Sequence, residues 1–143
     1  MDDDREYEAR VWSASEERKL FWDSLGATED TVLAPLVDPS LLGGPAWPGR
    51  PQYRQIVRDG ARLLVSDGLS GPFQDDRGPG FGVELLIEPS DDDLLRPLAD
   101  WIFPTLAAMC SVVAGHGSVR SLLDECGSIS SEVDGALFPE ALR

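Results

Sequence analysis

His116 is the only histidine in the chain, so any catalytic device that needs an imidazole would have to use it. In a Ser-His-Asp arrangement the ring acts as a general base and must be held in a fixed orientation. His116 stands between Gly115 and Gly117, and flexible neighbours on both sides support a ring poorly. This pattern favours a histidine at the end of a helix, near the negative pole of its dipole. The alternative is a small hydrolase-type enzyme that uses His116 with an acidic residue.

Residue types that bind metals are present, but their spacing fits no metal module. Zinc modules take four ligands in close pairs, and Cys110, His116 and Cys126 do not provide them. The consecutive aspartates at 91–93 lack the alternation of an EF-hand loop and suit the capping of a helix. The glycines at 78–82 lead into a strand rather than a helix, so they are not a phosphate-binding loop. We therefore expect neither a metal nor a cofactor.

Acidic residues outnumber basic ones, and this limits the classes of partner. Of 143 residues, 26 are Asp or Glu and 12 are Lys or Arg, which gives a formal net charge of −14. Nucleic acid and anionic membrane surfaces repel such a chain. A basic protein partner fits the charge, and so does simple solubility. The length and the 42% hydrophobic content indicate one globular domain over residues 1–143.

The sequence has no run of about 18 apolar residues that would span a membrane, and its acidic start, MDDDREYEAR, is unlike a secretory signal. We therefore expect a cytoplasmic protein in which Cys110 and Cys126 are free thiols. Cys110 lies in an apolar run, so we expect it to be buried. All the basic residues except Lys19 are arginines, which is typical of a GC-rich genome and favours a bacterial source.

In the first third of the chain, residues 1–14 resemble a polar lead-in. Ser13 and Glu16 fit a capping box, which predicts a helix over 16–25 with Leu20, Phe21 and Leu25 facing inward. A second short helix is predicted over 29–34, and a loop rich in proline and glycine over 38–51. We expect the tryptophans to pack in the core rather than to stack on bases, because no basic groove surrounds them. These residues are Trp12, Trp22, Trp47 and Trp101.

The middle of the chain has the pattern of strands. A hairpin is predicted from 53–57 and 61–66, with its turn at Asp59-Gly60. A loop over 67–80 then leads to a strand over 81–88. Its apolar residues, Phe81, Val83, Leu85 and Ile87, alternate onto one face. Glu84 falls on the opposite face, where it either points to solvent or pairs with an arginine, and an ion pair is favoured over contact with a partner protein.

The last third of the chain has the apolar spacing of helices. A long helix is predicted from Leu94 to about Gly115, kinked or split at Pro104 because proline removes a backbone donor. A short helix follows over 119–126, and the tail over 128–143 has no clear period. The order of elements predicts an α+β domain, with a mostly antiparallel sheet covered by the long kinked helix and by short helices.

Two segments together resemble the Suppressor of fused domain family. Residues 67–73 read Asp-Gly-Leu-Ser-Gly-Pro-Phe, and residues 80–85 read Gly-Phe-Gly-Val-Glu-Leu. A tryptophan-containing helix that ends near His-Gly follows in the same order as in the family. The resemblance covers roughly residues 46–140. Its motif positions are Gly68, Leu69, Ser70, Pro72, Phe73, Gly80, Gly82, Glu84, Leu85, Trp101, His116 and Gly117.

This resemblance implies a protein-binding module rather than an enzyme. Bacterial members of the family are similar to immunity proteins that neutralise toxins, which implies a toxin or a regulated protein as the partner. The net charge of −14 favours a basic toxin. Family members usually continue with further strands, so the end at Arg143 implies a short or truncated member with an exposed sheet edge. The surface that we expect to contact the partner comprises two acidic clusters. Their residues are Asp75, Asp76, Asp91, Asp92 and Asp93.

Overall fold

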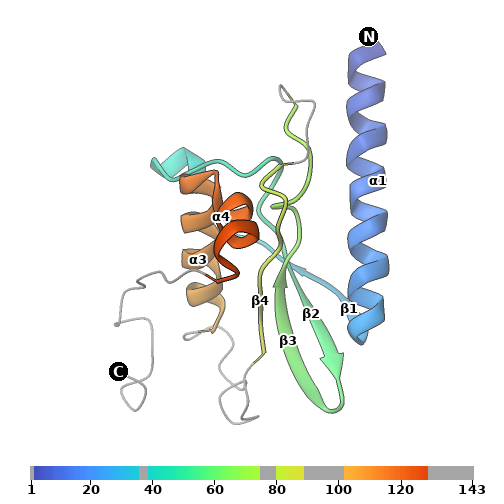
Figure 1. Cartoon of the computed structure of the whole chain (residues 1–143). Helices are drawn as coiled ribbons and strands as arrows, with labels where there is room; N and C mark the ends of the chain where they lie inside the picture. The colour runs from blue at the N-terminus through green and yellow to red at the C-terminus, as the bar shows by residue number, and fades with distance from the viewer. Residues whose placement is uncertain (1, 36–38, 75–79, 89–101, 129–143) are drawn as a thin grey trace.

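A computed structural model describes residues 2–35, 39–74, 80–88 and 102–128. The described chain forms a small sheet with one long helix on one side and two shorter helices on the other (Figure 1). The elements in order are α1 (Asp2–Leu25), β1 (Ala27–Leu33), the 3₁₀ helix η1 (Pro39–Leu42), β2 (Tyr53–Arg58), β3 (Ala61–Ser66), β4 (Leu86–Ile87), α3 (Phe103–His116) and α4 (Val119–Cys126).

The strands form one antiparallel sheet in the order β1-β2-β3-β4, which confirms the predicted α+β class. At its centre, β2 and β3 make the predicted hairpin. Its turn residues Asp59 and Gly60 have φ angles of 51° and 79°. Two successive positive φ angles match the twist of the adjoining strands, and Asp-Gly is a preferred pair for such a turn.

The two faces of this sheet are covered by different helices (Figure 1). Because side chains alternate along a strand, Ile56, Leu63 and Val65 point to one face, where they pack with Trp22 of α1. Tyr53 and Leu64 point to the other face. There they join a larger cluster with residues of α3 and α4, among them Leu106, Cys110, Val113 and Val119. The described structure therefore has three layers, with α1 on one side of the sheet and α3 and α4 on the other.

The N-terminal prediction was wrong. Residues 2–14 belong to α1 rather than to a polar lead-in, and no helix begins at the predicted capping box. The aspartates at positions 2–4 lie in the first turn, where they suit the positive end of the helix dipole. The inward face is also different, because Leu20 is 70% and Phe21 57% exposed whereas Trp22 is 3% exposed. The face toward the sheet carries Arg18, Trp22 and Leu25, which are spaced by three and four residues.

Residues 29–34 were predicted as a helix, but most of them belong to β1, which pairs with β2. This short segment has too few residues for a stable helix on its own, and pairing with β2 satisfies its backbone instead. The ladder is irregular between Thr28 and Val32. Trp12, predicted to be in the core, is 69% exposed on α1, whereas Trp22 and Trp47 are buried as predicted. Trp101 lies outside the described residues.

The predicted strand over 81–88 pairs in a regular ladder only at β4, opposite Leu64 and Val65. Two further backbone bonds extend the contact, from the Ser66 N–H to the Leu85 carbonyl and from the Phe81 N–H to the Leu69 carbonyl. The predicted alternation is confirmed, since the apolar residues of this segment pack against the core under α3. These residues are Phe81, Val83, Leu85 and Ile87.

Pro104 lies in the first turn of α3, which begins at Phe103, and its missing N–H has no partner to lose there. Residues 94–101 of the predicted long helix lie outside the described residues, so the predicted kink or split at Pro104 stays a prediction. The tail from 129 also lies outside the described residues. The helix ends at His116, and Gly117 follows it with a φ of 77° in the left-handed region, as the glycine spacing predicted. Helix α4 has the predicted bounds, with Gly127 after it.

Among the described residues, no single helix is both long and apolar enough to cross a membrane. Helices α3 and α4 reach that length and composition only as a pair, and the pair is bent by 94°.

The register of α1 can be tested with its tryptophans. Replacing Trp22 by alanine removes a buried ring, so we expect the free energy of unfolding to fall by about 3 kcal/mol. Trp12→Ala is the matched control and should change it by less than about 0.5 kcal/mol, because this ring is mostly in solvent. Urea unfolding followed by circular dichroism measures both values, and equal losses would contradict the described register.

Candidate functional site

The two motif segments meet at the side chain of Glu84. Its Oε1 accepts hydrogen bonds from the backbone N–H of Gly68 and of Ser70, each at 2.9 Å, and from the Ser70 hydroxyl at 2.8 Å. Its Oε2 accepts one from the Ser66 hydroxyl, which in turn accepts one from the Leu85 N–H at 2.8 Å. We call this group of Ser66, Gly68, Ser70 and Glu84 the carboxylate clamp.

The clamp holds the turn after β3 against the segment that leads into β4. The Glu84 side chain is only 8% exposed, so its charge needs these donors. Gly68 has a φ of 146°, and a Cβ there would lie 3.6 Å from the Arg50 carbonyl and 3.7 Å from the Trp47 ring. A carboxylate whose lone pairs are occupied in this way stabilises a loop and is poorly placed to act as a base.

A second polar group lies beside the clamp and joins α1 to the sheet. Asp67 accepts a hydrogen bond from Nε of Arg18 on one oxygen and from Nε of Arg54 on the other, both at 2.9 Å. The Arg18 Nε also lies 3.8 Å from Oε1 of Glu84. We call Arg18, Arg54 and Asp67 the arginine bridge. The favoured prediction for Glu84, pairing with an arginine, is confirmed, although hydrogen bonds to the loop make up most of its contacts.

Arg18 and Arg54 were not identified from the sequence. A signal for Arg54 was present, because it alternates with Tyr53 and Gln55 in a strand that is buried on both faces. A charge on an inward-facing position of such a strand needs a partner of opposite sign. Nothing local signals Arg18, since its role depends on which face of α1 contacts the sheet.

Cys110 of α3 lies on the other side of the clamp, where it is fully buried in the core, and it is a free thiol as predicted. Burial, followed by the negative charge of Glu84, raises the pKa of this thiol from 9.0 to about 12, although a hydrogen bond with Ser66 acts in the opposite direction. Burial also raises the pKa of Tyr53, with a smaller contribution from Cys110. Cys110 therefore stays protonated at neutral pH and is not a nucleophile. Cys126 is also a free thiol, and it is exposed.

The remaining motif positions have different roles. Leu69 is fully buried, Pro72 is buried, and Phe73 contacts Phe81 edge to face with ring centroids 5.3 Å apart. A Cβ at Gly80 would overlap the Gly71 and Leu69 carbonyls, whereas Gly82 has a φ of 71°. The motif glycines therefore permit close backbone approach and a turn.

His116 lies exposed in the last turn of α3, as predicted, and no carboxylate contacts it among the described residues. Within the same part of the chain, no three metal-binding side chains of His, Cys, Asp or Glu lie together. Trp101 and the acidic residues predicted to bind a partner lie outside the described residues. These predicted partner-binding positions are Asp75, Asp76, Asp91, Asp92 and Asp93.

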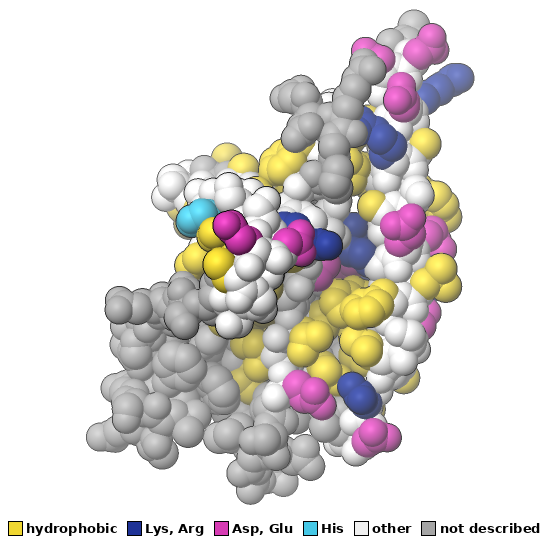
Figure 2. Space-filling model, viewed as in Figure 1, with side chains coloured by type: hydrophobic (Ala, Val, Ile, Leu, Met, Phe, Trp, Pro, Cys, Tyr) yellow, Lys and Arg dark blue, Asp and Glu magenta, His cyan; other side chains and the backbone are white. Residues whose placement is uncertain are grey.

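Two cavities adjoin the arginine bridge and run along α1. One has a volume of about 260 Å³ and is lined by Trp22 and Asp23 of α1 and by Glu29 and Asp30 of β1. The other has a volume of about 220 Å³ and reaches from Tyr7 to Arg50. Both include Ser15, Arg54 and Asp67 in their walls. Figure 2 shows Lys or Arg side chains between α1 and the loops at the top of the view, with a hydrophobic patch below them.

Comparison with protein-family models, with curated proteins and with solved structures gave no match to this chain. The likeness to Suppressor of fused domains therefore stays a prediction from the two motif segments.

The clamp can be tested by removing its acceptor. Glu84→Ala leaves buried donors of the 66–70 turn without a partner, so we expect the free energy of unfolding to fall by about 3 kcal/mol. Glu88→Ala, at an exposed position of the same segment, is the control and should change it by less than about 0.5 kcal/mol. Chemical denaturation gives both values, and a small loss for Glu84→Ala would contradict the structural role of the clamp.

The Cys110 thiol predicts a dependence of stability on pH. The folded protein keeps a proton that the unfolded chain loses, so this residue's contribution to stability falls as pH rises from about 9 toward 12. The stability of the wild type relative to Cys110→Ala should therefore be constant up to about pH 8 and shrink by about pH 11. Denaturant titrations of both proteins across this range measure the difference, and a constant difference would contradict the raised pKa.

Proposed function

We propose that the protein is a non-enzymatic protein-binding module of the Suppressor of fused type. In this proposal it acts in the bacterial cytoplasm as an immunity protein that neutralises a basic toxin, or as a regulatory binding partner. The observation that carries the proposal is the carboxylate clamp. It gives the Gly-Leu-Ser and Gly-Val-Glu-Leu segments, which carry the resemblance, a shared structural role.

The chemistry of the described side chains supports binding rather than catalysis. Glu84 of the carboxylate clamp accepts hydrogen bonds from loop donors, and Asp67 of the arginine bridge is bonded to two arginines. The Cys110 thiol is buried, with its pKa raised to about 12. The alternative of an enzyme using His116 gains no support from its exposed position at the end of α3.

The surface offers features of an interface. Trp12, Leu20 and Phe21 expose more than half of their area along α1, and exposed aromatic groups are common at protein contacts. The net charge of −14 would speed the capture of a basic partner through long-range attraction. A basic toxin, such as a nuclease, fits both features.

Co-expression with the product of the adjacent gene tests this proposal. If that product is toxic, the wild-type protein should restore growth and form a complex that survives purification. His116→Ala should restore growth equally well, because binding does not need the imidazole. Loss of rescue by a folded His116→Ala protein would favour the enzyme, and absence of both complex and rescue would contradict the proposal.

A further inference from the structure

The two cavities lie next to each other along α1, and we call them together the groove; its two ends carry opposite charges. The cavities share Ser15, Arg54 and Asp67 in their walls, so they meet at the arginine bridge. One wall is α1, and the other comprises β1, the start of β2 and residues 49–52. From Tyr7 to Asp23 along the helix, the groove is about 24 Å long.

One end of the groove is basic, although the whole chain is strongly acidic. Arg18, Arg50 and Arg54 line it, and Asp67 is the carboxylate in its wall. Asp67 is bonded through the Nε atoms of Arg18 and Arg54, which leaves Arg50 exposed and without an ion pair among the described residues. Glu84 also lies near Arg18. The three arginines and the two carboxylates, Asp67 and Glu84, together leave this end with one excess positive charge.

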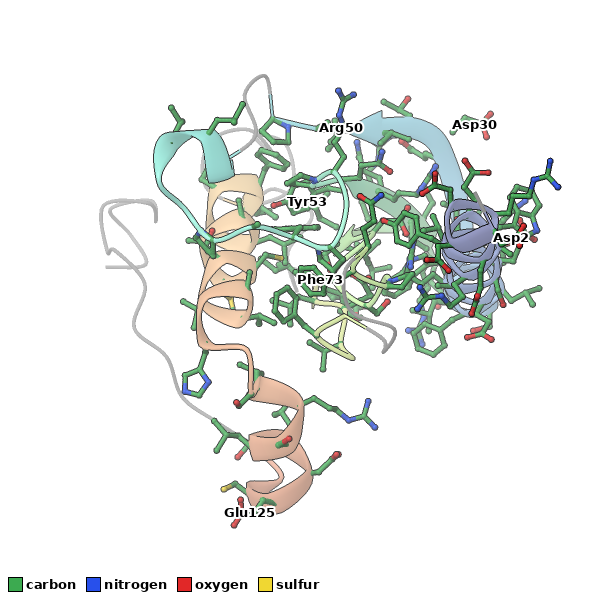
Figure 3. The ribbon with its side chains drawn as sticks, turned by 90° about the horizontal axis from the view of Figure 1, so that it is seen from above. Asp2, Asp30, Arg50, Tyr53, Phe73 and Glu125 are labelled. Carbon is green, nitrogen blue, oxygen red and sulfur yellow. The ribbon has the colours of Figure 1, made fainter. Side chains whose placement is uncertain are left out.

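The other end is acidic. Asp23, Glu29 and Asp30 line it, with Lys19 as the one cation besides Arg54 in the wall of this cavity. Glu29 lies 3.6 Å from an arginine outside the cavity wall, and Asp23 accepts a hydrogen bond from Thr28. Asp30 is exposed and has no ion-pair partner within the described part of the chain. In Figure 3, Asp30 lies beside α1, on the same side of the molecule as Arg50.

Two residues of the α1 wall carry a buried donor that has no acceptor in the described part of the chain. The indole N–H of Trp22, a residue that is 3% exposed, has no acceptor among the described residues, and neither has Nη1 of Arg18. A buried donor without an acceptor costs about 1–3 kcal/mol. An extended peptide supplies a carbonyl oxygen at every residue, and about seven residues would span the groove.

We propose that this groove binds an extended segment of the partner protein. The segment places an acidic side chain at Arg50 and a basic side chain at Asp30, and its backbone carbonyls face α1. This inference rests on the proposed protein-binding function and specifies the site and the chemistry of the ligand. The separated charges fix the direction in which the segment lies, because reversal would bring like charges together at both ends.

Two acetylated and amidated heptapeptides test the proposal. One has glutamate at one end and arginine at the other, with serine and alanine between, and the other has glutamine at both ends. Titration into the ¹⁵N-labelled protein should give a saturable shift of the Trp22 indole signal with the charged peptide and binding about tenfold weaker with the glutamine peptide. Absence of a saturable shift with the charged peptide, or equal binding of both, would overturn the proposal.

Removal of both groove charges gives a sharper test. The double variant Asp30→Asn with Arg50→Gln keeps the net charge of the chain, and it should bind the charged peptide no more tightly than the glutamine peptide. The control pair Arg58→Gln with Glu125→Gln removes two exposed charges outside the groove walls and should leave the preference for the charged peptide unchanged. The same effect in both double variants would show that position in the groove does not matter.

The same variants separate this proposal from the proposed function in the co-expression assay. If the wild type and the control pair restore growth and the groove variant does not, both proposals are supported. If all three restore growth equally, the groove is not the partner site, while the protein-binding function stands. If none does, the protein-binding function fails, and the peptide titration still decides whether the groove binds a segment of opposed charges.

Discussion

The hydrogen bonds to the Glu84 carboxylate are the interaction on which the described structure most depends. They connect the turn that follows β3 to the segment that leads into β4, and the donor Gly68 and the acceptor Glu84 are sixteen positions apart in the chain. A carboxylate that is 8% exposed is unfavourable unless donors surround it, and the backbone N–H groups of the turn also need an acceptor. Each side of the contact therefore requires the other, which makes the two motif segments one structural unit.

The polar groups around this carboxylate hold three layers together. On one side, Arg18 and Arg54 meet Asp67 and join α1 to the sheet. On the other side, Ser66 lies between Glu84 and the buried Cys110 of α3. Charged pairs with little exposure give orientation more than stability, because the cost of desolvation offsets much of the attraction. Helix α1, which buries few apolar residues, is thus oriented on the sheet by its arginine as well as by Trp22.

The functional proposals follow from this assignment of the polar residues. Once Glu84, Asp67, Arg18 and Arg54 are assigned to structural contacts, the features left for function are on the surface. They are the exposed aromatic side chains of α1 and the ends of the groove beside it. Such features suit recognition of another protein, where complementary charges set orientation and the rate of encounter.

The sequence alone determined the features that depend on a residue and its immediate neighbours. The sequence predicted the Asp59-Gly60 turn and the ends of α3 and α4 near Gly117 and Gly127, because glycine tolerates positive φ angles. It also predicted that alternate apolar residues over 81–87 pack against the core, because side chains alternate along a strand. It also brought Glu84 to notice and favoured an arginine as its partner. Neither that arginine nor the hydrogen bonds to the turn could be specified from the spacing.

Only the tertiary structure decided which face of α1 is buried, whether 27–33 pairs as a strand, and which cations meet Asp67. Leu20 and Phe21 are apolar like Trp22, and the sequence offers no local reason to expose them and bury their neighbour. The choice comes from the sheet, since Ile56, Leu63 and Val65 form the surface against which Trp22 packs. A contact between residues more than thirty positions apart leaves no trace in the local pattern, because its free energy exists only when both surfaces are assembled.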